Sequence, residues 1–273
     1  MQKTILITGS TDGIGLEAAK ILVSLGHCIL LHGRNKEKLA NVEMLLSSLS
    51  TSACVESYVA DLSRLSNVAA LAKAVTEKHN KLDVLINNAG IFKAASSITQ
   101  DGLDVRFAVN TLAPYMLTKK LVPLLGSSAR VINVSSAAQS PVSLEALAGR
   151  IKLSDEFNAY AQSKLAITMW SRTMALLTKN EGPAIIAVNP GSLLGTKMVK
   201  EGFNIVGKDI RIGADILIRL ALEDEFATAS GLYFDNDRGQ LAAPHRDALD
   251  ARKSEKVVSA IESILAEFSR NQD

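Results

Sequence analysis

Cysteine, histidine and aromatic residues are scarce in this chain of 273 residues, which has two cysteines, four histidines and one tryptophan. Neither Cys28 nor Cys54 falls in a CxxC or Cys/His spacing, so the sequence shows no metal-ligand pattern and we expect no metal. Cys28 lies in an apolar run and Cys54 begins another. We expect both as reduced thiols in the core.

Long apolar runs and a strong charge of one sign are also missing. The formal net charge is +2 and the charged residues are scattered, which gives no basic footprint for nucleic acid or a membrane surface. No apolar stretch approaches the roughly 20 residues of a membrane span. The start, MQKTILITGS, enters a predicted strand without the features of a signal peptide. We therefore expect a soluble, cytoplasmic protein.

Hydrophobic residues make up 47% of the chain, enough for a large core. Short aliphatic runs alternate with longer segments of helical period, the pattern of βαβ units. The predicted strands are Thr4–Thr8, Cys28–His32, Cys54–Val59, Val84–Asn87, Val131–Val134, Ala184–Val188 and Leu232–Phe234. The main predicted helices are Gly15–Leu25, Leu103–Leu125 and Ala159–Lys179. We expect one α/β domain over residues 1–273: a Rossmann-type, doubly wound, mainly parallel seven-stranded sheet with helices on both faces.

A glycine-rich turn, TGSTDGIG, follows the first predicted strand and opens a helix. Gly9, Gly13 and Gly15 lack Cβ atoms, so the backbone can approach a pyrophosphate whose charge the helix N-terminus stabilises. We expect Ser10 and Ile14 of the same turn to contact the dinucleotide. The alternative is a structural turn without a ligand, because glycine-rich turns alone are weak signals.

The residue after the second strand bears on which dinucleotide is bound. Gly33 occupies the place where an acid would hold the ribose 2′-hydroxyl of NAD, and Arg34 follows it. A guanidinium suits a 2′-phosphate, so NADP is favoured over NAD, with a solvated surface arginine as the alternative. Asp12, within the glycine turn, would repel phosphates unless its carboxylate points outward. His32 precedes Gly33, and we expect a hydrogen-bonded strand-end histidine rather than a ligand.

Further motifs follow in a fixed order along the chain. They are Asp61-Leu62, NNAG at Asn87–Gly90, Asn110, NVSS ending at Ser136, YAQSK at Tyr160–Lys164, and NPG at Asn189–Gly191. With the glycine turn, this order and spacing resemble the short-chain dehydrogenase/reductase family from residue 4 to about residue 234. The later segments SGLYFDN and APHRDALDARK further resemble its retinol-dehydrogenase-like branch.

The chemistry of that family explains why these residue types are needed. Hydride transfer between a carbinol carbon and nicotinamide requires a matching proton transfer at oxygen. The pKa of tyrosine is about 10, so a nearby cation must favour the phenolate if Tyr160 is to act as a base. Lys164 follows four residues later on a predicted helix, so both side chains share a face. Taken singly, Tyr160 is more simply interpreted as an exposed aromatic residue and Lys164 as a solvated helix lysine than as catalytic residues.

The resemblance implies further roles. Lys164 would also hold the nicotinamide ribose, Ser136 would hydrogen-bond the substrate oxygen, and Asn110 would anchor a water, although a helix-bending asparagine is the alternative. The remaining dinucleotide contacts implied are Asp61 and Leu62 at the adenine, Asn87, Ala89 and Gly90 at the adenosine ribose, and Pro190 and Gly191.

Two departures from the family pattern concern the substrate side. Ser136 and Tyr160 are 24 positions apart, a longer gap than is typical, and Gly195 stands where threonine is common, with Thr196 one place later. A contact of Thr196 with the nicotinamide is therefore in doubt. We expect residues 137–158 and 192–209 to form a substrate lid, with core packing of their side chains as the alternative. The apolar side chains expected to line it are Val142, Leu144, Leu147, Leu193, Leu194, Met198 and Phe203.

The sequence thus predicts an NADP(H)-dependent oxidoreductase that interconverts an apolar alcohol and its ketone or aldehyde. Two alternatives are a non-catalytic dinucleotide-binding redox sensor and a nucleotide-sugar epimerase or dehydratase. A sensor would not need the catalytic set, and an epimerase usually carries a larger C-terminal domain than the 40 or so residues that follow the last predicted strand. The resemblance also implies a homo-oligomer, a dimer or tetramer, through the helices Leu103–Leu125 and Ala159–Lys179.

Overall fold

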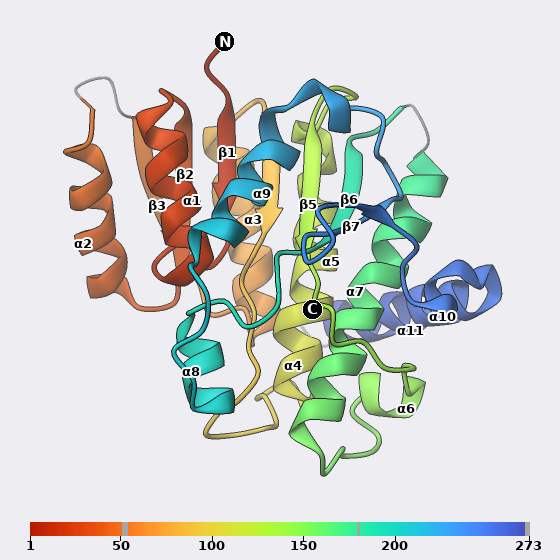
Figure 1. Ribbon diagram of the computed structural model, residues 1–273. Helices are drawn as coiled ribbons and strands as arrows, with labels where there is room; N and C mark the ends of the chain where they lie inside the picture. Colours follow the sequence, from red (N-terminus) through yellow and green to blue (C-terminus); the bar gives the residue numbers. More distant parts are fainter. Residues whose placement is uncertain (51–53, 179–180, 271–273) are drawn as a thin grey trace.

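The computed structural model describes residues 1–50, 54–178 and 181–270 of the chain. Within these ranges the centre is an eight-stranded sheet in the order β3-β2-β1-β4-β5-β6-β7-β8 (Figure 1). The strands are β1 Thr4–Ile7, β2 Cys28–Gly33, β3 Cys54–Val59, β4 Val84–Asn87, β5 Arg130–Val134, β6 Ala184–Asn189, β7 Tyr233–Asp235 and β8 Gln240–Ala242. Seven are parallel, and β8 pairs antiparallel with β7. The predicted doubly wound α/β fold is confirmed.

The prediction of seven strands was wrong by one. The additional strand, β8, has three residues and lies at the edge of the sheet, where Gln240 and Leu241 are exposed. Such a short strand carries no periodic apolar signal. The central strands β1, β4, β5 and β6 are almost continuous apolar runs because helices cover both faces of a parallel sheet.

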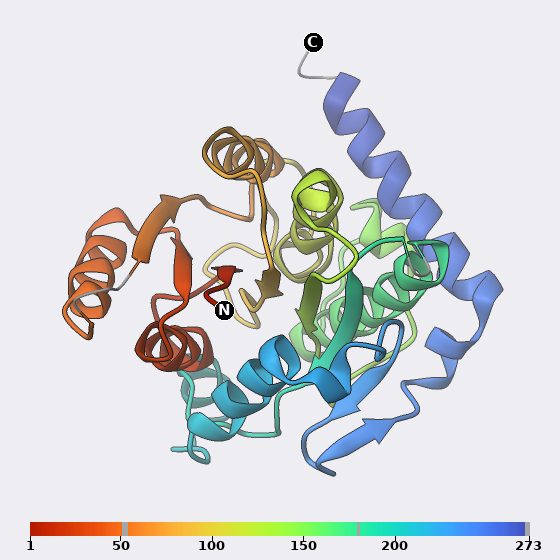
Figure 2. The ribbon, with the colours of Figure 1, turned by 90° about the horizontal axis from the view of Figure 1, so that it is seen from above.

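Helices form a layer on each side of the sheet (Figure 2). Their bounds are α1 Gly13–Ser24, α2 Lys36–Ser47, α3 Leu65–Lys78, α4 Val105–Phe107, α5 Ala113–Leu121, α6 Leu144–Leu147, α7 Glu156–Thr178, α8 Lys197–Phe203, α9 Arg211–Leu222, α10 Arg246–Leu249 and α11 Ala251–Arg270. One apolar core joins α1, α2 and α9 to the sheet, and a second joins α3, α5 and α7. A π-helical turn, Ala108–Leu112, links α4 to α5.

The two cysteines differ from the sequence expectation. Cys28 and Cys54 begin β2 and β3, and the parallel register places them directly opposite each other, with a Cα–Cα distance of 4.4 Å. They form a disulfide, so the prediction of reduced thiols was wrong. Their separation of 26 residues gave no sign of this, because only the strand register brings them together.

The C-terminal helix α11 lies diagonally across the outer side of the α5/α7 layer (Figure 2). Val257 and Ile261 are buried beneath it. On its flank the Glu262 carboxylate accepts hydrogen bonds from the hydroxyl of Tyr115 and the ammonium of Lys119, both on α5. α11 therefore covers part of the surface that the sequence predicted as a subunit contact. No helix in the described part of the chain combines the length and apolar character needed to cross a membrane.

Candidate active site

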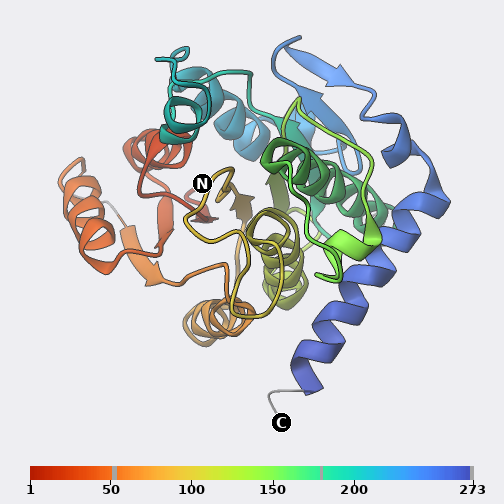
Figure 3. The same ribbon diagram turned by 90° about the horizontal axis from the view of Figure 1, so that it is seen from below.

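The carboxyl ends of the parallel strands meet at one end of the molecule, where α6 and α8 also lie (Figure 3). The glycine turn leaves β1 at this end. Gly9 and Gly13 have φ values of +66° and +52°, which favour glycine. A Cβ atom on Gly15 would lie 2.4 Å from Nδ2 of Asn88 and 2.5 Å from the carbonyl oxygen of Gly9. The turn is therefore a close-packed backbone cradle that opens α1, whose first N–H groups suit a phosphate.

Asp12 is the N-cap of α1. Its carboxylate accepts from the backbone N–H of Gly13 and pairs with the Lys38 ammonium at the start of α2. The hydrogen bond with Lys38, the largest favourable contribution, lowers the pKa of the Asp12 carboxyl. The carboxylate is thus turned toward a cation, which removes the phosphate repulsion that its position in the sequence suggested.

His32 holds the glycine turn from behind. Its Nδ1 accepts from the N–H of Gly9 at 3.1 Å and its Nε2 donates to the carbonyl oxygen of Ala60 at 3.1 Å. Burial lowers the pKa of His32 to about 4, so the ring is neutral at pH 7. The prediction of a hydrogen-bonded strand-end histidine is confirmed. The ring also links the turn to the segment that leads into Asp61.

Asn88 is a structural contributor that the sequence analysis did not single out. Its Nδ2 donates to the carbonyl oxygens of Thr8 and Gly9, at 3.0 and 3.1 Å. The hydroxyl of Thr8 in turn accepts from the N–H groups of Asn88 and Ala89. The second asparagine of the NNAG motif therefore fastens the end of β4 to the glycine turn, and its place in that motif was the available signal.

Two of the residues expected to contact the dinucleotide, Ser10 and Asn87, use their side chains in hydrogen bonds within the protein interior. The Ser10 hydroxyl is fully buried and bonded to the backbone of His32. The Asn87 amide donates to Thr118 and Asn133 on the side of α5. Both residues lie at the expected strand ends, but their side chains serve the protein interior. A role for them in dinucleotide binding stays a prediction.

The other expected contacts border the same end of the sheet. Asp61 accepts from the N–H and hydroxyl of Ser63, and Leu62 is buried. Arg34 follows β2 and is exposed, and it has no hydrogen bond or ion pair with another residue in the described ranges. Its guanidinium is therefore available to an anion.

Four residues named from the sequence come together beside this cradle. Tyr160 and Lys164 lie on α7, and the Ser136 side chain, which follows β5, is near enough to the Tyr160 hydroxyl to influence its pKa. The Lys164 ammonium donates to the carbonyl oxygen of Val134 at 2.7 Å and lies 5.7 Å from the centre of the Tyr160 ring. A Cβ atom on Gly90 would lie 3.5 Å from both the Lys164 ammonium and Oδ1 of Asn110. These contacts place Tyr160, Lys164 and Asn110 in one cluster, with Ser136 beside Tyr160.

Asn110 belongs to the π-helical turn between α4 and α5. Its amide exchanges two hydrogen bonds with the backbone of Ile91, at 2.8 and 2.9 Å, and donates to the Ser163 hydroxyl at 2.9 Å. A π-helical turn inserts a residue into a helix and often marks a functional site. Here it aligns one amide with both the end of β4 and α7.

Burial sets the protonation of the two central groups. It raises the pKa of the Tyr160 hydroxyl, against a smaller opposing effect of the Ser136 hydrogen bond. It lowers the pKa of the Lys164 ammonium to about 7, and that side chain is only 2% exposed. At neutral pH, Tyr160 is thus a neutral phenol that can donate a proton, next to a lysine whose charge is easily gained or lost.

The two segments of the expected lid behave differently. In residues 192–209, α8 places Met198 near Gly90, and the Phe203 ring stacks on Phe92 at 5.8 Å. Phe92 in turn packs edge-on against the Tyr160 ring at 5.4 Å. This segment therefore lies over the cluster.

In residues 137–158 the apolar side chains Val142, Leu144 and Leu147 pack into the core that includes α11. For these three side chains the alternative of core packing holds in place of the substrate wall, because the C-terminal helix supplies a partner that the motifs did not reveal. Within residues 192–209, Leu194 is buried and Leu193 is exposed. Thr196 caps α8 through its hydroxyl, and its methyl carbon lies 3.4 Å from the place of a Cβ on Gly13.

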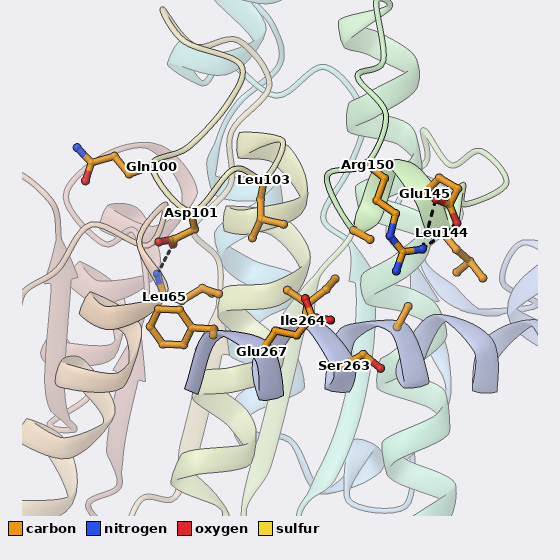
Figure 4. A pocket seen from close by; sticks show the side chains of 13 residues that line it. Leu65, Gln100, Asp101, Leu103, Leu144, Glu145, Arg150, Ser263, Ile264 and Glu267 are labelled. Atoms are coloured by element: carbon orange, nitrogen blue, oxygen red, sulfur yellow. Dashed lines mark hydrogen bonds and ion pairs between the residues drawn. The ribbon is translucent and has the colours of Figure 1, made fainter. Parts of the chain in front are cut away.

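A separate groove has a volume of about 550 Å³, and Figure 4 shows the side chains that line it. α11, α6 and the turn before α4 enclose it, and its lining includes Leu65, Leu103, Leu144, Ile264 and Phe268. None of the expected catalytic residues lines it. In the described ranges, no three histidine, cysteine, aspartate or glutamate side chains are grouped to hold a metal ion.

Comparisons with solved structures show where this fold recurs. An uncharacterized protein from Mycobacterium paratuberculosis superposes with a TM-score of 0.81 and 27% identity, covering 96% of this chain and 93% of that chain. RhlG from Pseudomonas aeruginosa, in an active-site complex with NADP, superposes with a TM-score of 0.69 and 26% identity, covering 87% of this chain and 95% of that chain.

Sequence comparisons give the same result. Human retinol dehydrogenase 13 is 29% identical over 270 residues, which cover 90% of this chain and 80% of that protein. Mouse retinol dehydrogenase 12 is 31% identical, covering 85% of this chain and 77% of that protein. Human polyprenol dehydrogenase is 33% identical, covering 72% of this chain and 62% of that protein. Residues 3–204 match the family model described as short chain dehydrogenase. The chain belongs to the short-chain dehydrogenase/reductase family of oxidoreductases, in its retinol-dehydrogenase-like branch.

Proposed function

We propose that this protein is an NADP(H)-dependent oxidoreductase that interconverts an apolar alcohol and its aldehyde or ketone. The observation that carries the proposal is the gathering of Tyr160, Lys164 and Asn110 into one cluster at the carboxyl ends of the strands, with Ser136 beside Tyr160. This cluster adjoins the glycine cradle, where added Cβ atoms would collide with the backbone. The residues present therefore fit a dinucleotide, which supplies or accepts the hydride when bound.

The protein's own part is to hold the substrate oxygen and move a proton. Ser136 and Tyr160 can both donate to that oxygen, which fixes the carbonyl carbon toward the cradle. In carbonyl reduction the Tyr160 phenol gives up its proton, and its raised pKa keeps the proton available at neutral pH. In alcohol oxidation the phenolate must form, and the adjacent Lys164 ammonium stabilises that anion.

Asn110 is proposed to support the cluster from the side of α5. It ties the segment after β4 to Ser163, whose hydroxyl donates to the carbonyl oxygen of Tyr160 at 2.7 Å. This chain of bonds runs from the backbone of Ile91 to the backbone of Tyr160 on α7. It keeps Tyr160 and Lys164 at a fixed height above the sheet.

The preference for NADP rests on Arg34. The guanidinium is exposed at the end of β2, where the acid that would hold an NAD ribose is replaced by Gly33. A solved structure of a metagenomic short-chain oxidoreductase, 28% identical and with a TM-score of 0.60, also contains NADP. Together with RhlG, it supports the same cofactor here.

The apolar substrate rests on the aromatic side chains around Tyr160. Phe92 touches the Tyr160 ring and is flanked by Phe203 and Phe157, each 46% exposed. Relatives carry the names retinol dehydrogenase and polyprenol dehydrogenase. Retinol and polyprenol are both long apolar alcohols. We therefore propose a bulky hydrophobic alcohol or carbonyl compound as the substrate class.

Assembly and location stay predictions. A homo-oligomer through α5 and α7 has to accommodate α11, which already packs on both helices. The cytoplasmic location expected from the sequence is open to cell fractionation.

The test is a panel of aldehydes, ketones and alcohols of increasing apolar length, each assayed with NADPH or NADP and again with the 2′-dephospho cofactor. We expect turnover of the longer apolar compounds, with a higher kcat/KM for the phosphorylated cofactor. Absence of turnover together with tight NADPH binding would favour the redox-sensor alternative.

A further inference from the structure

The hairpin formed by β7 and β8 contacts the two loops that flank the cluster, the loop after β5 and the loop after β6, through polar side chains. β7 pairs with the end of β6, where Asn189 stands opposite Asp235. The turn that follows contains Asn236 and Asp237 and closes at Gly239, which has a φ of +66°. The hairpin therefore places three polar residues beside the Pro190-Gly191 loop.

Asp237 binds the loop after β6 on both sides of the Pro190-Gly191 pair. One carboxylate oxygen accepts from the backbone N–H of Ser192 at 2.8 Å. The other accepts from the Asn189 amide at 2.8 Å and from the Ser192 hydroxyl. Charge-assisted hydrogen bonds of this kind are stronger than neutral ones. One carboxylate thus fixes the two ends of the loop.

Asn236 adds a second attachment to the same loop. Its backbone N–H donates to the carbonyl oxygen of Asn189 at 3.1 Å. Its side-chain amide donates to the carbonyl oxygens of Pro190 and Ile212, at 2.9 and 3.1 Å. The loop is therefore held at its backbone as well as at its side chains, and it is joined to the start of α9.

Tyr233 holds the other loop. Its hydroxyl donates to the carbonyl oxygen of Ser136 at 3.1 Å, across 97 residues of sequence. The same oxygen also accepts from the amide of Gln139 at 2.9 Å. The ring of Tyr233 is buried in the sheet, so its hydroxyl is a rigid donor. It fixes the backbone of Ser136, the serine of the cluster.

We propose that the β7–β8 hairpin is a positioning element for hydride transfer, in which Tyr233 sets the place of Ser136 and Asp237 sets the place of the Pro190–Ser192 loop. Both loops belong to the site proposed above, so the inference rests on the proposed function. The segment of residues 192–209 carries Met198 and Phe203 over the cluster. Its first residue, Ser192, is one of the residues that Asp237 binds. A displacement of about 1 Å at reacting atoms can cost roughly a hundredfold in rate, so one rigid hairpin touching both loops matters.

The first test compares two deletions of a tyrosine hydroxyl. Tyr233→Phe keeps the ring and loses the bond to Ser136. Tyr115→Phe is the matched control, because it loses a similarly part-buried hydroxyl contact, to Glu262, and within the described ranges the Tyr115 hydroxyl makes no hydrogen bond with Ser136 or the Pro190–Ser192 loop. We expect Tyr233→Phe to lower kcat roughly tenfold while leaving the dissociation constant of NADPH unchanged. Tyr115→Phe should lower only the melting temperature. Kinetics of Tyr233→Phe that match those of Tyr115→Phe would overturn the role of Tyr233.

The second test removes the charge at Asp237. Asp237→Asn should raise the dissociation constant of NADPH, measured by the fluorescence of the bound cofactor, roughly tenfold, because an amide cannot accept all three bonds. Asp237→Glu should restore part of the affinity. Asp247→Asn is the control, since Asp247 is a buried carboxylate paired with Lys253 at 2.7 Å and lies outside the site.

Ser192→Ala, which removes a single bond to Asp237, keeps the test decisive if Asp237→Asn does not fold, and should weaken NADPH binding in the same direction. Equal NADPH affinity in wild type, Asp237→Asn and Ser192→Ala would refute the positioning role while leaving the proposed oxidoreductase intact. A wild-type chain that neither binds NADPH nor turns over any compound would refute both proposals.

Discussion

Replacement of Lys164 by methionine should abolish turnover and yet stabilise the folded chain at neutral pH. The ammonium is 2% exposed and donates to one described acceptor, the carbonyl oxygen of Val134. Burial without a paired carboxylate penalises the charged form, which is why its pKa falls from 10.5 to about 7. Methionine keeps the length and apolar character of the stem without the charge.

The size of this stabilisation follows from the difference between the pKa of Lys164 in the folded chain and its pKa in the unfolded chain. Below pH 7 the lysine is charged in both states and the folded chain bears the full penalty, about 5 kcal/mol at 1.36 kcal/mol per pKa unit. Between pH 7 and 10.5 the unfolded chain binds more protons, so the penalty falls by about 1.4 kcal/mol for each pH unit and vanishes near 10.5. Loss of the bond to Val134 costs roughly 2 kcal/mol at every pH. We therefore expect a net gain of about 3 kcal/mol at pH 7.

The assay is urea unfolding of wild type and Lys164→Met at several pH values between 6.5 and 9.5. Lys120→Met, at an exposed position of α5, is the control and should show no pH-dependent difference. The free energy of unfolding of Lys164→Met minus that of wild type should decrease steadily as the pH rises. A difference that is constant with pH, or a destabilised variant at pH 7, would refute the burial argument.

Three further predictions concern the cofactor, the assembly and the lid. Arg34→Ala should raise the dissociation constant of NADPH at least tenfold and leave that of NADH nearly unchanged, as measured by titration, because only NADPH carries a 2′-phosphate. Equal losses for both would remove Arg34 from cofactor selection. Light scattering should show whether the homo-oligomer exists, and a monomer at high micromolar concentration would contradict it. Limited proteolysis should cleave residues 192–209 in the free protein and be suppressed by NADP with substrate; cleavage unaffected by ligands would contradict a lid.

The strands and the cluster were predictable from sequence because their signals are local or tied to chain order. β3 and β4 were predicted at their observed bounds. β4 is a buried, short apolar run, as expected for a central parallel strand, whereas β3 is a half-buried edge strand that begins an apolar-rich segment after a turn. Tyr160 and Lys164 share a helix face, and the motif order brought Ser136 and Asn110 to the same end of the sheet.

The features that were missed depend on contacts between distant segments. The disulfide between Cys28 and Cys54 follows from the register of β2 and β3, which the sequence does not show. Leu144 was assigned to a lid because its partner, α11, begins more than 100 residues later in the sequence. The bond from Tyr233 to Ser136 likewise depends on β7 lying beside β6. Each needs the tertiary arrangement before the residue's surroundings can be stated.

The most direct test of the central claim follows the hydride itself. NADPH carrying deuterium on the transferring position of C4 is incubated with an apolar aldehyde or ketone that the panel identifies, and the alcohol product is analysed by mass spectrometry. With wild type, we expect one deuterium on the carbinol carbon. With Tyr160→Phe, deuterium transfer should slow by at least a hundredfold while NADPH binding is retained, because the proton donor is gone. Product without deuterium, or undiminished transfer by Tyr160→Phe, would contradict the mechanism.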